Sequence, residues 1–413
     1  MSPKPHEMGH DPAAVDPALV SIPHDHPWAR LPYVFAACGA VGVLASLGLV
    51  WGSVVEPAQF FFSWLTSFLY FLSLALGGMF FVLVSYVTRA SWSVVVRRLA
   101  ESAMATIPLF LVLFVPLVFG MHALFHWTDA DAVAHDHLLQ AKQPYLNTTF
   151  FVVRALVYFA CWIGIATWFL RQSRLQDHGD ASGRITDRMV KVSAPALVAF
   201  SVTVSFAAID WIMTLDAHWY STIFGVYFFA GSTVGIFALL ILLAAAMGRA
   251  GLLGGTVTVE HFHDLGKMLF AFTVFWAYIG FSQYFLIWYG NIPEETVWYV
   301  HRTEGSWAAV TATLAWGHFA VPFLFLMPRT VKRRTGLLAV GAVWMLLMHL
   351  VDLYWLIMPV LHSHDAHLSV VDVTSLVGIG GLFLGAVLFV LRRQPVVPVR
   401  DPRLAESLSF ENV

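Results

Sequence analysis

The amino-acid sequence predicts an all-α integral membrane protein with about ten transmembrane helices. Hydrophobic residues make up 59% of its 413 positions and charged residues only 12%, whereas a soluble domain carries about 25% charged residues. Apolar runs of about 20 residues, the length that spans a bilayer as a helix, recur ten times. Lipid excludes open strands and the short alternating segments of a closed barrel are absent, so these runs are expected to be helices.

The ten runs define one membrane domain, residues 31–392, between tails at 1–30 and 393–413. The expected spans are 31–51, 60–87, 104–124, 148–170, 193–213, 222–248, 267–289, 306–326, 336–359 and 371–392. The second and sixth share aromatic-rich starts and small-residue middles, which suggests two four-helix bundles, helices 2–5 and 6–9, flanked by helices 1 and 10. Four glycines in those middles are expected to allow close helix packing: Gly77, Gly78, Gly231 and Gly235.

Basic residues predict how the chain is oriented. They gather before helix 1, after helices 2, 4, 8 and 10, and around the loop between helices 6 and 7, all on one side. Of the 23 lysines and arginines, only Lys142, Arg154 and Arg302 lie elsewhere. By the positive-inside rule both termini are expected in the cytoplasm. The opposite loops, 125–147 and 290–305, are acidic and could dock a periplasmic partner or simply be solvated.

The tails and the composition limit the function classes. Residues 1–30 contain no short apolar segment after a basic start, so a cleaved signal peptide is not expected. Their four histidines favour a mobile tail lying on a partner over a metal site.

The net charge of −2 gives no reason to expect nucleic acid. Cys38 and Cys161 lie in apolar runs and cannot form a disulfide framework, an iron–sulfur site or a covalent haem attachment. Phosphate-binding, zinc-protease and serine-hydrolase motifs are absent.

The stretch Ser205–Gly231 links two apolar runs through a turn rich in aromatic and ionisable residues. Aromatic rings of this kind gather at a membrane–water interface. Asp210 lies within hydrocarbon depth, where a carboxylate is costly and indicates a functional site, and Asp216 lies nearer water. The alternative is a helix cap or a structural ion pair, and Arg154 on helix 4 lies at the right depth to pair with Asp210.

Other polar groups fall near mid-membrane or in the outer half. His349 and Asp352 share one helix face, so the carboxylate could orient the imidazole or raise its pKa. His318 lies at a similar depth, Gln283 adds an amide, and Asp372 opens helix 10 from outside. Together they favour a polar cavity or proton relay over isolated helix–helix hydrogen bonds. One bis-histidine haem between His318 and His349 is geometrically possible.

The inner half of the membrane domain is poorer in ionisable residues. Its helices offer mainly hydroxyl groups, with a few charged side chains at the cytoplasmic mouth. A continuous relay of carboxylates and histidines to the cytoplasm is therefore not expected, and proton conduction across the full membrane would need hydroxyls and water.

Two blocks carry a resemblance to a known family: DWIMTLDAHWYSTIFGVYFFAG (Asp210–Gly231) and HDLGKMLFAFTVFWAYIGFSQYFLIWYGNIPEETVWYVHR (His263–Arg302). With the ten-helix layout, over nearly all of residues 30–395, the chain resembles the ActF subunits of bacterial alternative complex III. That family is similar to the polysulfide-reductase membrane subunits, whose core is two four-helix bundles. The resemblance implies a membrane subunit of a quinol:cytochrome c oxidoreductase in a bacterial inner membrane.

The resemblance also implies partners and a division of labour. The partners would be the paralogue ActC, the iron–sulfur subunit, the c-type haem subunits and the lipid bilayer. Electrons would pass through those partners, because this chain has no residues to hold a carrier covalently or by metal ligands, and the remaining candidate ligand is a quinone, menaquinone or ubiquinone. ActF subunits are described as quinone-binding-type but are often assigned a proton-translocating or structural role.

The site residues expected from the sequence follow from both lines of reasoning. Asp210, His349 and Asp352 are expected to exchange protons, His318 to act as a relay or quinone contact, and Arg154 to supply counter-charge. The second choices for quinone contact or relay are Gln283, Asp216 and Asp372. Two alternatives remain open: a proton-coupled secondary transporter, and a purely structural scaffold.

Overall fold

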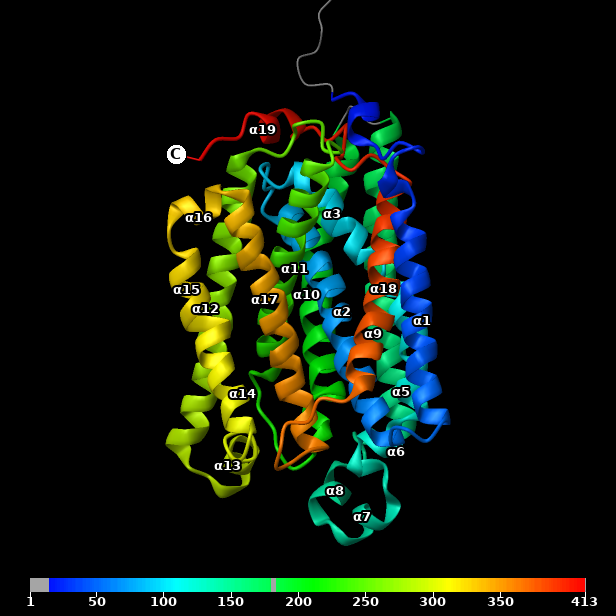
Figure 1. Cartoon of the computed structure of the whole chain (residues 1–413), viewed down its shortest axis with the longest axis vertical. Coiled ribbons are helices and arrows are strands. Elements are labelled where there is room, and N and C mark those ends of the chain that lie inside the picture. Colours follow the sequence, from blue (N-terminus) through cyan, green and yellow to red (C-terminus); the bar gives the residue numbers. More distant parts are fainter. Residues whose placement is uncertain (1–14, 180–182, 413) are drawn as a thin grey trace, which may run out of the picture.

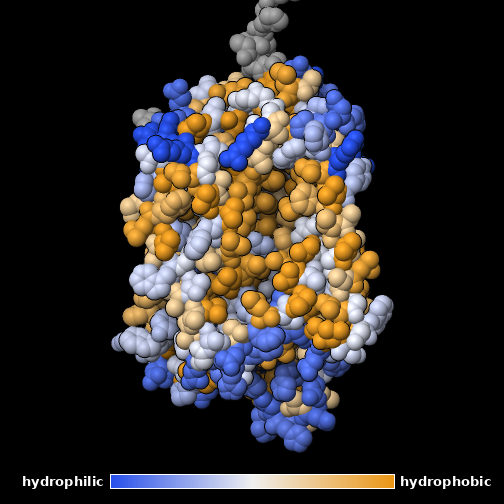
Figure 2. Space-filling model, viewed as in Figure 1, coloured by the Kyte–Doolittle hydropathy of each residue, from blue (hydrophilic) through white to orange (hydrophobic). Residues whose placement is uncertain are grey.

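The chain is all-helical in the computed structural model, which describes residues 15–179 and 183–412. Figure 1 shows long helices lying side by side, with both ends of the described chain at the same end of the molecule. Figure 2 shows an apolar band between two hydrophilic ends. Ten helical spans within the described ranges are long and apolar enough to cross a membrane, which confirms the predicted fold class: Leu31–Trp51, Pro57–Val87, Val94–Phe119, Thr148–Gly179, Arg184–Leu215, Phe224–Arg249, Val259–Gly290, Trp307–Leu326, Thr335–Val360 and Val370–Arg392.

Two central helices hold the molecule together. These are α2 (Pro57–Val87) and α11 (Phe224–Arg249). Of an apolar stretch of 18 residues in each helix, 83% is buried inside the protein in α2 and 89% in α11. Both are hydrophobic around their whole circumference, as expected for helices surrounded by protein. Helix α2 packs on α3 (Val94–Met104) and α10 (Arg184–Trp211), and α10 packs on α9 (Thr148–Gly179). Helices 2–5 therefore form the first bundle.

The second bundle forms around α11. It packs on α12 (Val259–Gly290) and α17 (Thr335–Ile357), and the remaining span runs through α14 (Trp307–Thr313), a π-helical segment at Leu314–Ala320, and α15 (Val321–Leu326). The two bundles meet where α2 contacts α11 and α17. The expected grouping of helices 2–5 and 6–9 is thus present.

Helices α1 (Leu31–Trp51) and α18 (Val370–Arg392) cross tightly beside the first bundle. Glycines make this crossing possible: a Cβ added to Gly42 would lie 2.6 Å from the backbone nitrogen of Gly378. Helix α18 also packs on α2. These two helices therefore flank the core, as predicted.

The third span begins ten residues before its predicted start at residue 104. Helix α3 carries three charged residues that are wholly buried near its beginning, Arg97, Arg98 and Glu101. Because they pair with other charges, the helix continues through them. The span then breaks into α4 (Ile107–Leu113), α5 (Val115–Phe119) and α6 (Met121–Leu124), since Pro108 and Pro116 have no N–H to donate to the preceding turn.

The two polar ends differ in structure. The acidic end carries α7 (Ala130–His135) and α8 (His137–Lys142), which project from the bundle in Figure 1, and α13 (Pro293–Val300). The basic end carries α16 (Arg329–Arg333) and the C-terminal residues with α19 (Leu404–Leu408). Short turns complete the chain at Pro17–Val20, Pro27–Ala29, His126–Thr128, Met213–Leu215 and Met358–Val360.

Both predicted tails include segments that pack on the membrane domain. The N–H of Val396 donates to the carbonyl of Val20 at 2.7 Å, and the side chains of both residues are buried. The N-terminal segment from residue 15 therefore lies on the chain itself. Of the tail histidines, His6 and His10 fall outside the described residues.

Candidate functional site

The carboxylate of Asp352 is the centre of a polar cluster inside the second bundle. Asp352 lies on α17 and is 2% exposed. The hydroxyl of Tyr227 on α11 donates to its Oδ1 at 2.5 Å, and the indole Nε1 of Trp276 on α12 donates to its Oδ2 at 3.0 Å. Three helices thus converge on one buried acid, and both neighbours offer hydrogens to it, the arrangement that an ionised carboxylate requires.

His318 joins this cluster through Trp276. The two rings stack with centroids 3.7 Å apart and planes 24° apart. His318 lies in the π-helical segment, where Pro322 has no N–H to donate to the carbonyl of His318. Neither ring nitrogen of His318 has a hydrogen-bond partner among the described residues, although the side chain is fully buried. Interrupted turns of this kind are frequent at functional sites.

His349 lies one turn before Asp352 on α17, but Ser73 is its hydrogen-bond partner. Its Nε2 is 2.8 Å from the hydroxyl oxygen of Ser73 on α2, at the junction of the two bundles. The hydrogen bond through which Asp352 could have oriented this imidazole is not present in the described chain: the carboxylate accepts from Tyr227 and Trp276, and Nδ1 of His349 has no partner there. The two side chains do share one helix face, as expected, since both border Gly231.

A cavity of about 370 Å³ adjoins the Asp352 cluster. Tyr227 and Trp276, the two donors to Asp352, form part of its wall. Gln283 supplies an amide whose oxygen accepts from Ser221 at 2.8 Å and whose nitrogen donates to the Tyr299 hydroxyl at 3.0 Å. The other lining residues are mostly apolar or aromatic: Ala277, Gly280, Phe281, Tyr284, Thr303, Thr311, Leu314, Ala315, Phe319 and Trp355. An apolar cavity with a few polar groups is the usual form of a small-molecule site.

The predicted pair of Arg154 and Asp210 is present in the first bundle. Arg154 on α9 donates from Nε to Oδ2 of Asp210 at 2.7 Å and from Nη2 to Oδ1 at 3.0 Å. The hydroxyls of Tyr145 and Tyr158 also donate to this carboxylate, at 2.9 and 2.7 Å. Its acceptor positions are therefore filled, and the pair does not lie in the Asp352 cluster. This geometry favours the structural ion pair over a proton-exchanging acid.

Asp216 and Asp372 also lie away from the Asp352 cluster. Asp216 lines a cavity of about 230 Å³ at the acidic end together with His218 and Arg302. Asp372 caps α18 by accepting from the N–H of Ser369 at 2.7 Å, and the Ser63 hydroxyl donates to it at 2.5 Å. It borders a second cavity of about 380 Å³. The eight site residues expected from the sequence therefore lie in several separate parts of the molecule and do not form one site.

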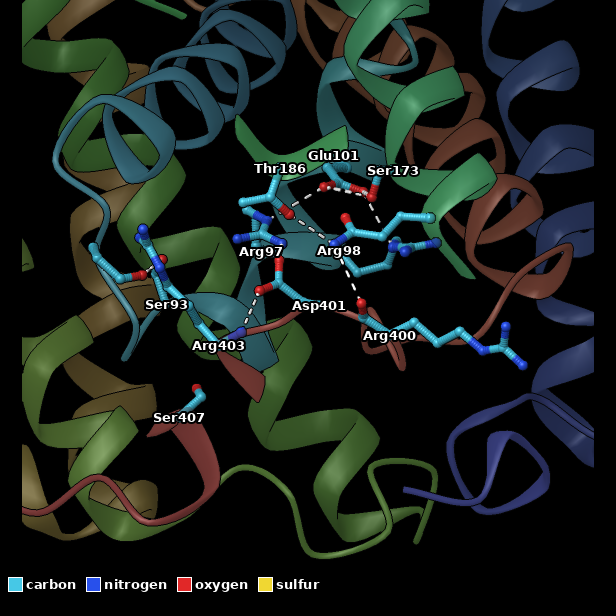
Figure 3. Close-up of polar contacts among 12 residues, drawn as sticks. Ser93, Arg97, Arg98, Glu101, Ser173, Thr186, Arg400, Asp401, Arg403 and Ser407 are labelled. Carbon is cyan, nitrogen blue, oxygen red and sulfur yellow. Dashed lines mark hydrogen bonds and ion pairs between the residues drawn. The ribbon is translucent and has the colours of Figure 1, made fainter. Parts of the chain in front are cut away.

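A buried charge cluster at the basic end was not expected from the sequence. Glu101 accepts from Ser173 at 2.8 Å and lies 3.1 Å from Arg98, while Arg97 pairs with Asp401 of the C-terminal segment, as Figure 3 shows. Arg98 also pairs with Asp177 at 2.8 Å. The inner half is therefore not poor in ionisable groups, which corrects the expectation. The sequence signal was the position of Glu101 four residues after Arg97 and three after Arg98, which indicates that these charges pair on one helix face but not that they are buried.

His318 and His349, the two histidines considered as haem ligands, each have a close contact with another side chain. Trp276 lies flat against the imidazole of His318, and Ser73 is hydrogen-bonded to Nε2 of His349. Bonding of Nε2 of His349 to a haem iron would therefore displace the Ser73 hydroxyl, whereas both ring nitrogens of His318 are without a hydrogen-bond partner among the described residues. Within residues 15–179 and 183–412, no group of three or more histidine, cysteine or acidic side chains could hold a metal ion.

No model of a known protein family matches this chain, and no curated protein matches it. The chain is a multi-pass membrane protein by its ten spans. Its function has to be inferred from the geometry of the Asp352 cluster and the cavity beside it.

Proposed function

We propose that this chain is the quinone-site membrane subunit of a quinol:cytochrome c oxidoreductase of the alternative complex III type, as its ActF-like sequence blocks suggest. One observation supports the proposal most. Tyr227 both lines the 370 Å³ cavity and donates its hydroxyl hydrogen to Asp352. A ligand in the cavity therefore has a proton acceptor within one hydrogen-bonded step.

The cavity suits an aromatic ring with oxygen substituents. Its volume is within the range of about 300–1,000 Å³ typical of small-molecule sites. Trp276, Phe281 and Phe319 offer apolar and aromatic surface to a ring, and Gln283 offers an amide to a ring oxygen. Gln283 is thus retained as a proposed quinone contact, and Asp352 as the proposed proton acceptor.

The proposed chemistry is oxidation of a quinol, which releases two protons and two electrons. Tyr227 would accept one hydroxyl proton of the quinol as its own proton moves to Asp352. The second proton would leave to water at the acidic end, and both electrons would pass to iron–sulfur or c-type haem centres of partner subunits. His318 is proposed as a relay that receives the proton from Asp352 through intervening water, because its contact with Trp276 is a ring stack and its ring nitrogens have no hydrogen-bond partner among the described residues.

The orientation and location are proposed on the same basis. The basic end, where both described termini lie, would face the cytoplasm of a bacterial inner membrane. The acidic end would then face the periplasmic partners.

A proton-coupled transporter is less well supported. Transporters of that class place interrupted helices at corresponding positions of two repeats. Here one interrupted span is Val94–Phe119, the second helix of the first bundle, and the other is Trp307–Leu326, the third helix of the second bundle. The two breaks are therefore not at corresponding positions of the bundles. Active transport by the purified chain alone would favour this alternative, whereas co-purification with haem c and iron–sulfur subunits would exclude it.

The test is quinol oxidation by the complex purified from its native membrane, with a short-chain quinol as donor and a c-type cytochrome as acceptor. Tyr227→Phe removes the hydroxyl between cavity and carboxylate, and we expect at least a tenfold loss, about 1.4 kcal/mol of barrier. Tyr354→Phe, in the second cavity, is the matched control and is expected to keep full activity.

The same complex gives a readout that does not depend on turnover. Ala277→Phe fills the proposed cavity, so less quinone should co-purify with this variant than with Val373→Phe, which fills the second cavity. A loss confined to Val373→Phe would move the quinone site there. Unchanged turnover and quinone content in every variant would leave a structural scaffold as the function.

A further inference from the structure

A groove of about 290 Å³ lies between α9 and α10 toward the basic end of the molecule. Its walls are Ile165, Trp168 and Val192, and Phe169 and Ala196 are buried at its floor. Gly164 leaves one side open, because a Cβ added there would meet no atom within 4 Å. The groove is therefore an apolar notch that is open on the side of Gly164.

The surrounding surface of these two helices is apolar as well. Large hydrophobic side chains are exposed along α9 and α10 within the two spans that these helices form: Phe150, Val153, Leu156, Val157, Val198, Val202 and Phe206. Surface of this kind on a membrane protein is suited to contact with acyl chains. The groove thus continues a face that fits lipid.

Cations lie at the basic end of the groove. Arg188 lines it, with its guanidinium 5.8 Å from the centre of the Trp168 ring. Arg184, Arg188 and Lys191 are spaced four and three residues apart and so share one face of α10, while Arg171 follows Trp168 by three residues on α9. All four are exposed, and none forms an ion pair among the described residues.

We propose that this groove binds an anionic phospholipid, with one acyl chain in the notch at Gly164 and the phosphate at Arg188. An apolar groove that ends at unpaired arginines between two transmembrane helices has the chemistry of a phospholipid headgroup site. Trp168 is placed between the two parts, as amphipathic rings are at membrane interfaces. This inference does not depend on quinone binding, because the groove lies in the first bundle.

The test is lipid retention by the purified full chain, measured by native mass spectrometry after incubation with phosphatidylglycerol, cardiolipin or phosphatidylcholine. Arg188→Gln removes the charge, and Arg249→Gln removes an exposed cation outside the groove. Gly164→Leu fills the notch, and Gly48→Leu is its control because an added Cβ is equally unobstructed there. All four substitutions are at exposed positions or in open space, so the fold should persist.

We expect the anionic lipids to be retained, and retention to fall about fivefold in Arg188→Gln and Gly164→Leu but not in the two controls. Equal retention of phosphatidylcholine would overturn the proposal. So would a loss in Arg188→Gln no greater than in Arg249→Gln. If inorganic phosphate displaced the lipid and Gly164→Leu retained as much lipid as the parent chain, the groove would be a phosphate site. That result would also count against the proposal.

Discussion

The hydroxyl of Tyr227 on α11 donates a 2.5 Å hydrogen bond to the carboxylate of Asp352 on α17. The same phenol forms part of a cavity wall. Because Asp352 itself does not line that cavity, Tyr227 is the connection between a ligand space and a buried acid. Trp276 likewise lines the cavity and donates to Asp352, and its ring also stacks on His318.

The Arg154–Asp210 pair should behave as a buried structural ion pair. Arg154→Met leaves the buried carboxylate without its cation and is expected to cost about 3–5 kcal/mol of stability. Adding Asp210→Asn removes the uncompensated charge, so the double variant should recover much of that loss. Thermal unfolding in detergent measures both. If the double variant lost as much stability as the two single variants added together, the two side chains would not be energetically coupled.

The C-terminal segment should contribute to stability through Asp401. This carboxylate is buried against Arg97. Asp401→Asn leaves Arg97 with Glu101 at 3.5 Å as its remaining acidic partner, and we expect a loss of about 3 kcal/mol. The melting temperature should fall clearly, while Asp187→Asn, at an exposed carboxylate without an ion pair in the described chain, should leave it unchanged. Equal melting temperatures would mean that the segment does not stabilise the cluster.

Gly231 should not tolerate a methyl group. A Cβ there would lie 2.9 Å from Cε1 and 3.0 Å from Nδ1 of His349, so Gly231→Ala is expected to push the imidazole away from Ser73. We expect a destabilisation of about 1–3 kcal/mol, as for other overpacked cores. At Gly48 the added Cβ meets nothing within 4 Å, so Gly48→Ala should be neutral or slightly stabilising. Melting curves that rank the two variants in the opposite order would contradict this packing.

The loop that carries α7 and α8 should loosen in acid. The hydrogen bond from His218, together with those from the N–H groups of Leu139 and Leu138, lowers the pKa of Asp136. A carboxyl group with a lowered pKa in the folded state stabilises that state above its ordinary pKa of about 3.9, and the contribution is lost as the pH falls through the folded value. The protection of the amide hydrogens in α7 and α8, measured relative to their intrinsic exchange rate at each pH, should therefore fall below about pH 4.

Asp136→Asn is expected to remove this part of the pH dependence and to leave exchange in the loop fast at neutral pH. Asp131→Asn, in the same loop, is the matched control because no side-chain hydrogen bond involves the Asp131 carboxylate in the described structure. If both variants keep the acid response of the parent chain, the contact between Asp136 and His218 does not hold the loop.

The sequence by itself determined the fold class, because the membrane imposes a length and a composition on each span. It also placed Arg154 opposite Asp210, since depth along two antiparallel helices can be counted from their ends. Close packing at Gly77, Gly78, Gly231 and Gly235 was predicted as well, and in the structure an added Cβ at each would meet a neighbouring helix.

Only the tertiary structure decided which polar groups meet. Depth gives no rotation about a helix axis, so the sequence could not show that Asp352 faces Tyr227 and Trp276 while His349 faces Ser73. Nor could it show that Arg97 and Arg98 are buried, because their partner carboxylates, Asp177 and Asp401, come from distant parts of the chain. Such contacts depend on how the helices pack against one another, and hydrophobic periodicity does not specify that.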